Sequence, residues 1–189
     1  MAKRKTTTRR ARAKSARSPA AKQDAIALLK ADHRQVEKWF EQFQTSRSEP
    51  KKSELAQEIC KALTIHTVIE EEIFYPAFYE ATGEKSLHHE AEIEHEGAKQ
   101  LIAQIKDSGP QDDYFDAKVK VLSEMIKHHV REEEKREGMF AKARESDMDL
   151  KALGEQLAAR KAQIMGSGEP LEDSNTRRRV SSSTELRAR

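Results

Sequence analysis

HTVIE at positions 66–70 and HVREE at positions 129–133 share one spacing, a histidine followed four positions later by a glutamate. In an α-helix this spacing places both side chains on one face, about one turn apart. Each copy lies on a stripe that is otherwise apolar, and two more histidines, His33 and His95, lie on stripes of their own. Four helices that each point a metal-ligand side chain inward are the pattern by which a bundle builds a metal site in its core.

Long amphipathic patterns surround these residues. Ser48 suits the cap at the start of a helix, and Gly83 suits the left-handed residue that ends one. Pro76 is expected to kink its helix or end the regular part, because its ring removes a donor and clashes with the preceding turn. Short loops make neighbouring helices antiparallel, so the predicted fold is all-α, an up-down-up-down four-helix bundle. The expected helices cover residues 23–44, 49–82, 86–107 and 111–145.

Composition and charge divide the chain further. Charged and apolar residues each make up 36% of it, with few glycines, prolines and aromatics, which favours helix over sheet. Residues 1–22 contain nine Lys or Arg and no acid, and they have almost no large apolar side chain, so they are predicted to be a disordered basic arm. The bundle is assigned to residues 23–145. Residues 146–165 are predicted to form a short accessory helix, and 166–189 a disordered tail.

The expected compartment is the cytoplasm. The one cysteine, Cys60, cannot form an internal disulfide and is too few for a thiolate metal site. The basic N-terminus has no apolar segment of the kind that a secretory signal requires. The apolar runs are too short to span a membrane.

Two carboxylates on core-facing stripes need an explanation. An unpaired buried Glu70 or Glu133 would cost several kcal/mol of desolvation. Arg136, one turn beyond Glu133, is the one nearby cation that could compensate this charge. A bound metal ion is the other candidate, and it also accounts for the four histidines. Imidazole and carboxylate ligands without a thiolate suit iron, manganese or zinc.

Five short sequence elements follow one another along the chain. They are Asp32-His33, the segment 66–70, the following EEIFYP at 71–76, Glu94-His95-Glu96 and the segment 129–133. In this arrangement, residues 23–145 resemble the hemerythrin-like (HHE cation-binding) family. The resemblance implies a four-helix bundle that holds two iron ions joined by an oxo or hydroxo bridge, and manganese shares this ligand chemistry. The implied terminal ligands are His33, His66, His95 and His129, and the implied bridging ligands are Glu70 and Glu133.

One departure from the family pattern bears on function. Oxygen-carrying members place two histidines one turn apart on the third helix, whereas Ala91 and Lys99 occupy the positions four before and four after His95. About two coordination positions are then left for water, a small ligand or a further side chain. This argues against stable oxygen carriage. It favours reaction with O2, peroxide or NO, including a catalase-like decomposition of peroxide, or the sensing and handling of iron under oxidative stress. The candidate extra ligands are Glu71, His88, Glu92 and Glu132.

Other residues receive simpler interpretations. A ferritin-like site would need two Glu-x-x-His motifs, and only Glu92 to His95 matches. Four glutamates near the site are interpreted as solvated, with Glu71 and Glu132 as the least secure of them. The aromatic residues after Glu70 are expected to pack in the core and at the end of the bundle. The glutamates are Glu71, Glu72, Glu132 and Glu134, and the aromatic residues are Phe74, Tyr75, Phe78 and Tyr79.

A second functional hypothesis belongs to a different class. The chain could be a helical interaction module with a structural metal, which binds nucleic acid or a protein partner through residues 1–22. Nine positive charges would bind phosphates without sequence preference, and salt would weaken the contact. The arm has no interleaved aromatics for base stacking, so a solubilising tail is the competing interpretation.

Overall fold

The computed structural model describes residues 23–167. The predicted basic arm at 1–22 and residues 168–189 of the predicted tail lie outside the described residues. Every regular element from residue 23 to 167 is helical, so the all-α prediction is confirmed for this part of the chain. The elements are α1 (Ala25–Thr45), α2 (Glu49–Ile69), the π-helical turn η1 (Glu70–Phe74), α3 (Tyr75–Thr82), α4 (Lys85–Asp107), α5 (Phe115–Glu134), α6 (Met139–Glu145) and α7 (Leu150–Ser167).

The helix ends follow from local chemistry. The carboxylate of Asp24 accepts a hydrogen bond from the amide of Ala27 (2.7 Å) at the start of α1. Ser48 caps α2 through the amide of Lys51, as predicted. Gly83 ends α3 in the left-handed conformation, with a φ of 69°, which glycine adopts without a Cβ penalty.

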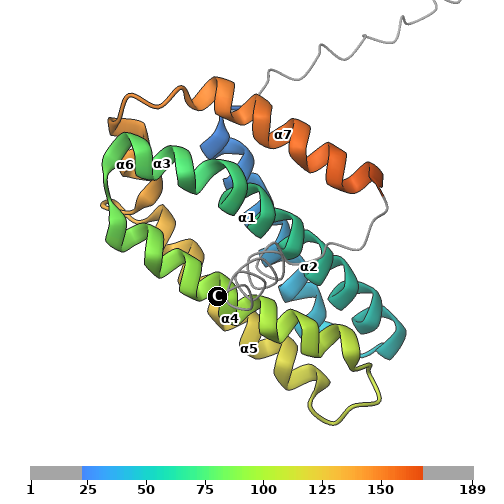
Figure 1. The fold of residues 1–189 in the computed structure, drawn as a ribbon. Helices are drawn as coiled ribbons and strands as arrows, with labels where there is room; N and C mark the ends of the chain where they lie inside the picture. The colour runs from blue at the N-terminus through green and yellow to red at the C-terminus, as the bar shows by residue number, and fades with distance from the viewer. Residues whose placement is uncertain (1–22, 168–189) are drawn as a thin grey trace, which may run out of the picture.

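α1, α2, α4 and α5 form the bundle (Figure 1). α1 packs against α2 and α5, and α4 packs against the same two helices, so the four helices close a ring of neighbours. This arrangement agrees with the predicted up-down-up-down bundle. In the described part of the chain, every helix is too short or too polar to cross a bilayer.

The regular α-helix before Pro76 ends at Ile69 and η1 follows it, in agreement with the predicted end of the regular part. The chain stays helical from Glu49 to Thr82. Just before the proline it passes through η1, a turn that is wider than a regular α-helical turn. In η1 the amide of Tyr75 donates to the carbonyl of Glu70, five residues earlier. Residues five apart lie about 140° apart around a regular α-helix. The wider turn brings Glu70 and Tyr75 toward the same side, and both are fully buried.

The fourth predicted helix is broken, which corrects the expectation of one helix to residue 145. α5 ends at Glu134, and α6 begins at Met139. Gly138 explains the turn: a Cβ there would lie 2.3 Å from the carbonyl oxygen of Glu132 and 2.6 Å from that of Glu133. The close return of the chain over the end of α5 therefore requires a glycine.

α7 packs lengthwise against α1, α2 and η1 (Figure 1). It begins at Leu150, where the Asp149 carboxylate accepts from the amide of Ala152 (2.9 Å). Ser146, the first residue of the predicted accessory helix, instead follows the end of α6. α7 ends at Ser167, so the first residues of the predicted tail are helical.

The core consists of two apolar clusters with a polar layer between them. One cluster includes Leu29, Ile69 and Phe140, together with Leu157 of α7. The other includes Val36, Leu63, Ile102 and Leu122. The residues of the polar layer lie between the two clusters along the bundle helices, and they are His33, His66, Glu70, His95, His129 and Glu133.

Gly154 gives a test of how α7 docks. A Cβ at this position would lie 2.5 Å from the carbonyl oxygen of Gln23 and 2.8 Å from the amide nitrogen of Ala25. Gly154→Ala should therefore destabilise the protein by about 1–3 kcal/mol through overpacking, measured by urea unfolding. Gly166→Ala, in the same helix with nothing within 4 Å of its Cβ, is the control and should be neutral or slightly stabilising. Equal midpoints for the two variants would contradict this packing.

Candidate metal centre

The six predicted ligands meet in one buried layer. α1 supplies His33, α2 and η1 supply His66 and Glu70, α4 supplies His95, and α5 supplies the remaining two. None of the six is more than 5% exposed. Their role as ligands stays a prediction, but the structure brings every one of them to the same place.

Their inner atoms form two groups. Nε2 of His33 lies 3.0 Å from Nε2 of His66, and Nε2 of His95 lies 3.2 Å from Nε2 of His129. Oε2 of Glu70 lies 3.2 Å from the His66 nitrogen and 3.4 Å from the His95 nitrogen. Ligand atoms of His33, His66 and Glu70 form one group that could hold an ion, and those of Glu70, His95 and His129 form another. Glu70 is shared by both.

Glu133 lies across the same two groups. Its Oε2 is 3.5 Å from Nε2 of His33 and 3.7 Å from Nε2 of His129. Each group thus has a histidine facing Glu133 and a histidine facing Glu70. Two carboxylates thus lie between two pairs of histidines.

The outer nitrogens of the four imidazoles face carboxylates. The Nδ1 atoms of His33, His95 and His129 lie 2.9, 3.1 and 2.8 Å from their partners, and that of His66 lies 3.6 Å from Oδ2 of Asp32. An ionised carboxylate can only accept, so a hydrogen-bonded Nδ1 bears the proton and Nε2 presents its lone pair inward. The partners, in order, are Glu134, Glu71, Glu94 and Asp32.

This finding corrects the interpretation of Glu134 and Glu71 as solvated residues. Each carboxylate is also paired with a cation: Glu71 lies 2.8 Å from Lys99, and Glu134 contacts Arg34 (2.5 Å). Burial raises the pKa of Glu134, but His33 and the neighbouring cations outweigh it and lower the pKa to about 2. The sequence could not show these pairs, because each carboxylate serves a histidine on another helix.

The layer needs positive charge. Among residues 23–167, no lysine or arginine is buried, and Arg136 is exposed, so it does not compensate Glu133. Burial lowers the pKa of His66, but Glu70 and Asp32 outweigh it and raise the pKa to about 10. Burial and the charge of Glu70 raise the pKa of Glu133 to about 8. Both shifts favour the protonated forms and so the positive charge that the two carboxylates call for.

The donor set fits a metal ion. Two imidazole lone pairs that face each other at 3.0 Å repel unless a proton or a cation lies between them. Nitrogens bound about 2.1 Å from one ion and at right angles to each other lie about 3 Å apart. Buried oxygens of both glutamates, Oε1 of Glu70 and Oε2 of Glu133, also lack any hydrogen-bond partner. A cation would satisfy these atoms.

Tyr75 is a site residue that the sequence interpretation missed. Its hydroxyl lies 3.1 Å from Oε1 of Glu133, 3.3 Å from Oε2 of Glu70 and 3.2 Å from Nε2 of His95. Burial and the charges of both glutamates raise the pKa of Tyr75 well above its usual value, so the hydroxyl stays a neutral donor. Tyr79, also expected to pack, is 44% exposed.

Three of the proposed extra ligands lie away from the layer. His88 is half-buried and lies 3.8 Å from Glu92, in a separate surface group with His89. Glu132 pairs with Lys135 at the surface. Of the four candidates, Glu71 is the one that hydrogen-bonds to a histidine of the layer, His95.

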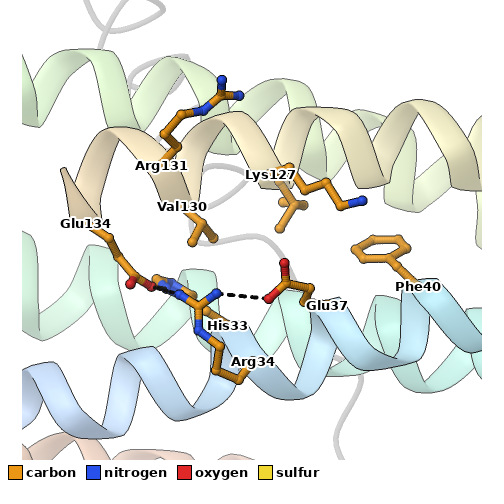
Figure 2. Close-up of a pocket in the computed structure, with 9 residues that line it drawn as sticks. His33, Arg34, Glu37, Phe40, Lys127, Val130, Arg131 and Glu134 are labelled. Atoms are coloured by element: carbon orange, nitrogen blue, oxygen red, sulfur yellow. Dashed lines mark hydrogen bonds and ion pairs between the residues drawn. The ribbon is translucent and has the colours of Figure 1, made fainter.

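Cavities lead to the layer from two sides. One of about 340 Å³ between α1 and α5 reaches His33, and one of about 400 Å³ between α4 and α5 reaches His95 and His129. Figure 2 shows the first, where the guanidinium of Arg34 lies between Glu134 and Glu37. Three of the four histidines of the layer therefore border an open pocket.

Tyr75→Phe tests the hydrogen bonds of the hydroxyl. The change leaves Oε1 of Glu133 buried without a partner, which should destabilise the chelator-treated protein by about 1–3 kcal/mol in urea unfolding. Tyr114→Phe, at a residue that is 71% exposed, is the control and should change little. A Tyr75→Phe protein as stable as the control would show that the hydroxyl is not needed to satisfy Glu133.

Comparison with known proteins agrees with this geometry. The family model described as Hemerythrin HHE cation binding domain matches residues 24–142, more than half of the chain. A protein of Nostoc sp. named DNA nickase is 34% identical over 107 residues, which cover 57% of this chain and 30% of that protein. The chain thus spans less than a third of that relative.

A solved structure shows the same fold. The crystal structure of a hemerythrin HHE cation binding domain-containing protein from Mycobacterium kansasii matches with a TM-score of 0.59 and 20% identity, over 76% of this chain and 88% of that one. With the fold, the buried layer and the family model in agreement, the resemblance predicted from the sequence is confirmed. The chain belongs to the hemerythrin HHE cation binding domain family.

Proposed function

We propose that the polar layer holds two iron ions and that the protein reacts there with small oxidants such as O2, peroxide or NO, or senses and handles iron. The observation that carries this proposal is the pair of three-residue donor groups that share Glu70. A single ion would leave one pair of facing imidazoles without a cation. Manganese suits the same donors and is the alternative metal.

The residues of this chain would hold, orient and shield the reacting centre. Bound iron would supply redox chemistry and an attachment point for the oxidant. The carboxylates on the outer nitrogens fix the direction of each imidazole lone pair, which tunes ligand strength. The Tyr75 hydroxyl can donate a hydrogen bond at the inner face of the layer.

The size of the inner cavity supports a small ligand. A cavity of about 10 Å³ is bounded by the four histidines and by apolar side chains such as Val36, Leu63 and Ile126. Such a space holds roughly one water-sized molecule. Apolar walls exclude further water, so the site favours very small molecules over larger substrates.

Metal analysis of ligand variants tests the proposal. Protein from iron-fed cells should contain about two irons per chain and show the visible absorption of a bridged ferric pair. Glu70→Ala should lose both ions because both groups use this residue, whereas His33→Ala should lose mainly one. Peroxide consumption should fall in both variants.

His89→Ala is the matched control, since His89 is exposed and lies outside the layer. It should retain iron content and peroxide consumption. Circular dichroism establishes that each variant is folded. Full iron in Glu70→Ala, or no metal in the folded wild-type protein, would overturn the proposal.

A second activity concerns residues 1–22. We propose that this segment binds nucleic acid, and two observations favour it: nine positive charges without an acid, and a relative whose printed name is DNA nickase. The contact would be electrostatic and independent of base sequence. It would hold the metal layer close to a phosphate backbone.

Deletion of residues 1–22 tests this activity. The full chain should bind duplex DNA with an affinity that falls steeply as salt increases, and the deleted chain should lose most of that affinity while keeping its iron. Supercoiled plasmid is a useful second substrate, because nicking would convert it to the relaxed form. Equal DNA affinity of the two proteins would contradict the proposal.

A further inference from the structure

One of the four histidine partners is held from outside the bundle. Glu71 pairs with Lys99 of α4, and Glu134 pairs with Arg34 of α1. Glu94 contacts the ring of His128 on α5. Asp32, the partner of His66, instead contacts the ammonium of Lys161 on α7. Both side chains are half-buried, so the contact is shielded from solvent on one side.

A second polar contact joins α7 to the same half of the site. Arg160 of α7 donates two hydrogen bonds to Glu72, from Nε (2.6 Å) and from Nη2 (3.1 Å). Glu72 lies in η1, two residues after Glu70. The buried Leu157 and Ile164 anchor this part of α7 in the apolar core. α7 therefore contacts the elements that position His66 and Glu70.

The environment of His66 differs from that of the other histidines. Its Nδ1 is buried without a hydrogen-bond partner, and Asp32 lies 3.6 Å away, whereas the other three distances are 3.1 Å or less. With one oxygen of Asp32 engaged by Lys161, the other is kept directed toward His66. Without Lys161, the carboxylate would be free to turn to solvent and leave His66 unsupported.

We propose that α7 controls the ion held by His33, His66 and Glu70, and that Lys161 is the positioning residue, acting through Asp32. The inference rests on the proposed metal site. The group of Glu70, His95 and His129 has its outer carboxylates paired within the bundle, so its ion is independent of Lys161. Because coupling is reciprocal, docking of α7 strengthens ion binding and the ion strengthens docking. α7 thereby reports whether this half of the site is filled.

Lys161→Met tests the inference, since it keeps the length of the side chain and removes the charge. Fe²⁺ is titrated anaerobically against a competing chelator. We expect the affinity for one of the two ions to fall about tenfold, which is the smallest loss of metal affinity usual when the hydrogen-bond partner of a ligand is removed. The affinity for the other ion should stay unchanged. Lys151→Met, at an exposed position of α7, is the charge-matched control and should bind both ions as the wild type does. Lys161→Arg should restore the affinity.

A double-mutant cycle identifies the route. If Lys161 acts through Asp32, then Lys161→Met should have no further effect on Fe²⁺ affinity in an Asp32→Asn background. Additive effects, equal loss of both ions, or unchanged or tighter binding in Lys161→Met would overturn the inference.

Hydrogen exchange gives a readout that does not depend on affinity. In the wild type, Fe²⁺ should slow amide exchange in α7, and in Lys161→Met this slowing should disappear. If Fe²⁺ does not change the rate of amide exchange in α7 of the wild type, the inference is also overturned. A wild-type protein that binds no Fe²⁺ would instead refute the proposed metal site, so the two failures are distinguishable.

Discussion

The structure depends on one constraint: six ionisable side chains are buried in a single layer that has no lysine or arginine among its described neighbours in the core. Removing such groups from water costs several kcal/mol per charge unless a counter-charge lies within the layer. The facing lone pairs of the histidines and the unpartnered oxygens of Glu70 and Glu133 all point to the same remedy, a cation at the centre. The two apolar clusters on either side provide the hydrophobic stabilisation that the layer itself does not.

From this layer the polar contacts extend outward in a repeated order, from imidazole to carboxylate and then to a lysine, an arginine or, for Glu94, a further histidine. The inner nitrogen of each histidine faces the centre, and a carboxylate faces its outer nitrogen. Lys99, His128 and Arg34 complete three of these chains from within the bundle, and Lys161 completes the fourth from α7. The order has a physical reason, because a carboxylate held by a cation keeps a fixed direction and so fixes the imidazole.

Two departures from regular helix lie next to the layer. η1 brings Tyr75 toward the same side as Glu70, and α3 continues the helical path through Pro76. At the end of α5, Gly138 lets the chain turn back over the carbonyls of Glu132 and Glu133. π turns are frequent at functional sites because they redirect side chains that a regular helix would separate. Here the redirected residue has a hydroxyl within hydrogen-bond distance of both carboxylates.

The sequence by itself determined the helical class, the family and the residues that meet in the layer. It could do so because a histidine and a glutamate spaced four apart lie on one face of a helix, whatever the rest of the chain does. The caps at Ser48 and Gly83 were equally readable, since they depend on neighbours in sequence. The break between α5 and α6, the π turn and the roles of Tyr75, Glu134 and Lys161 were decided by the tertiary structure. Each arises from contacts between residues distant in sequence, such as Lys161 with Asp32, and only the packing of α7 on the bundle brings those atoms together.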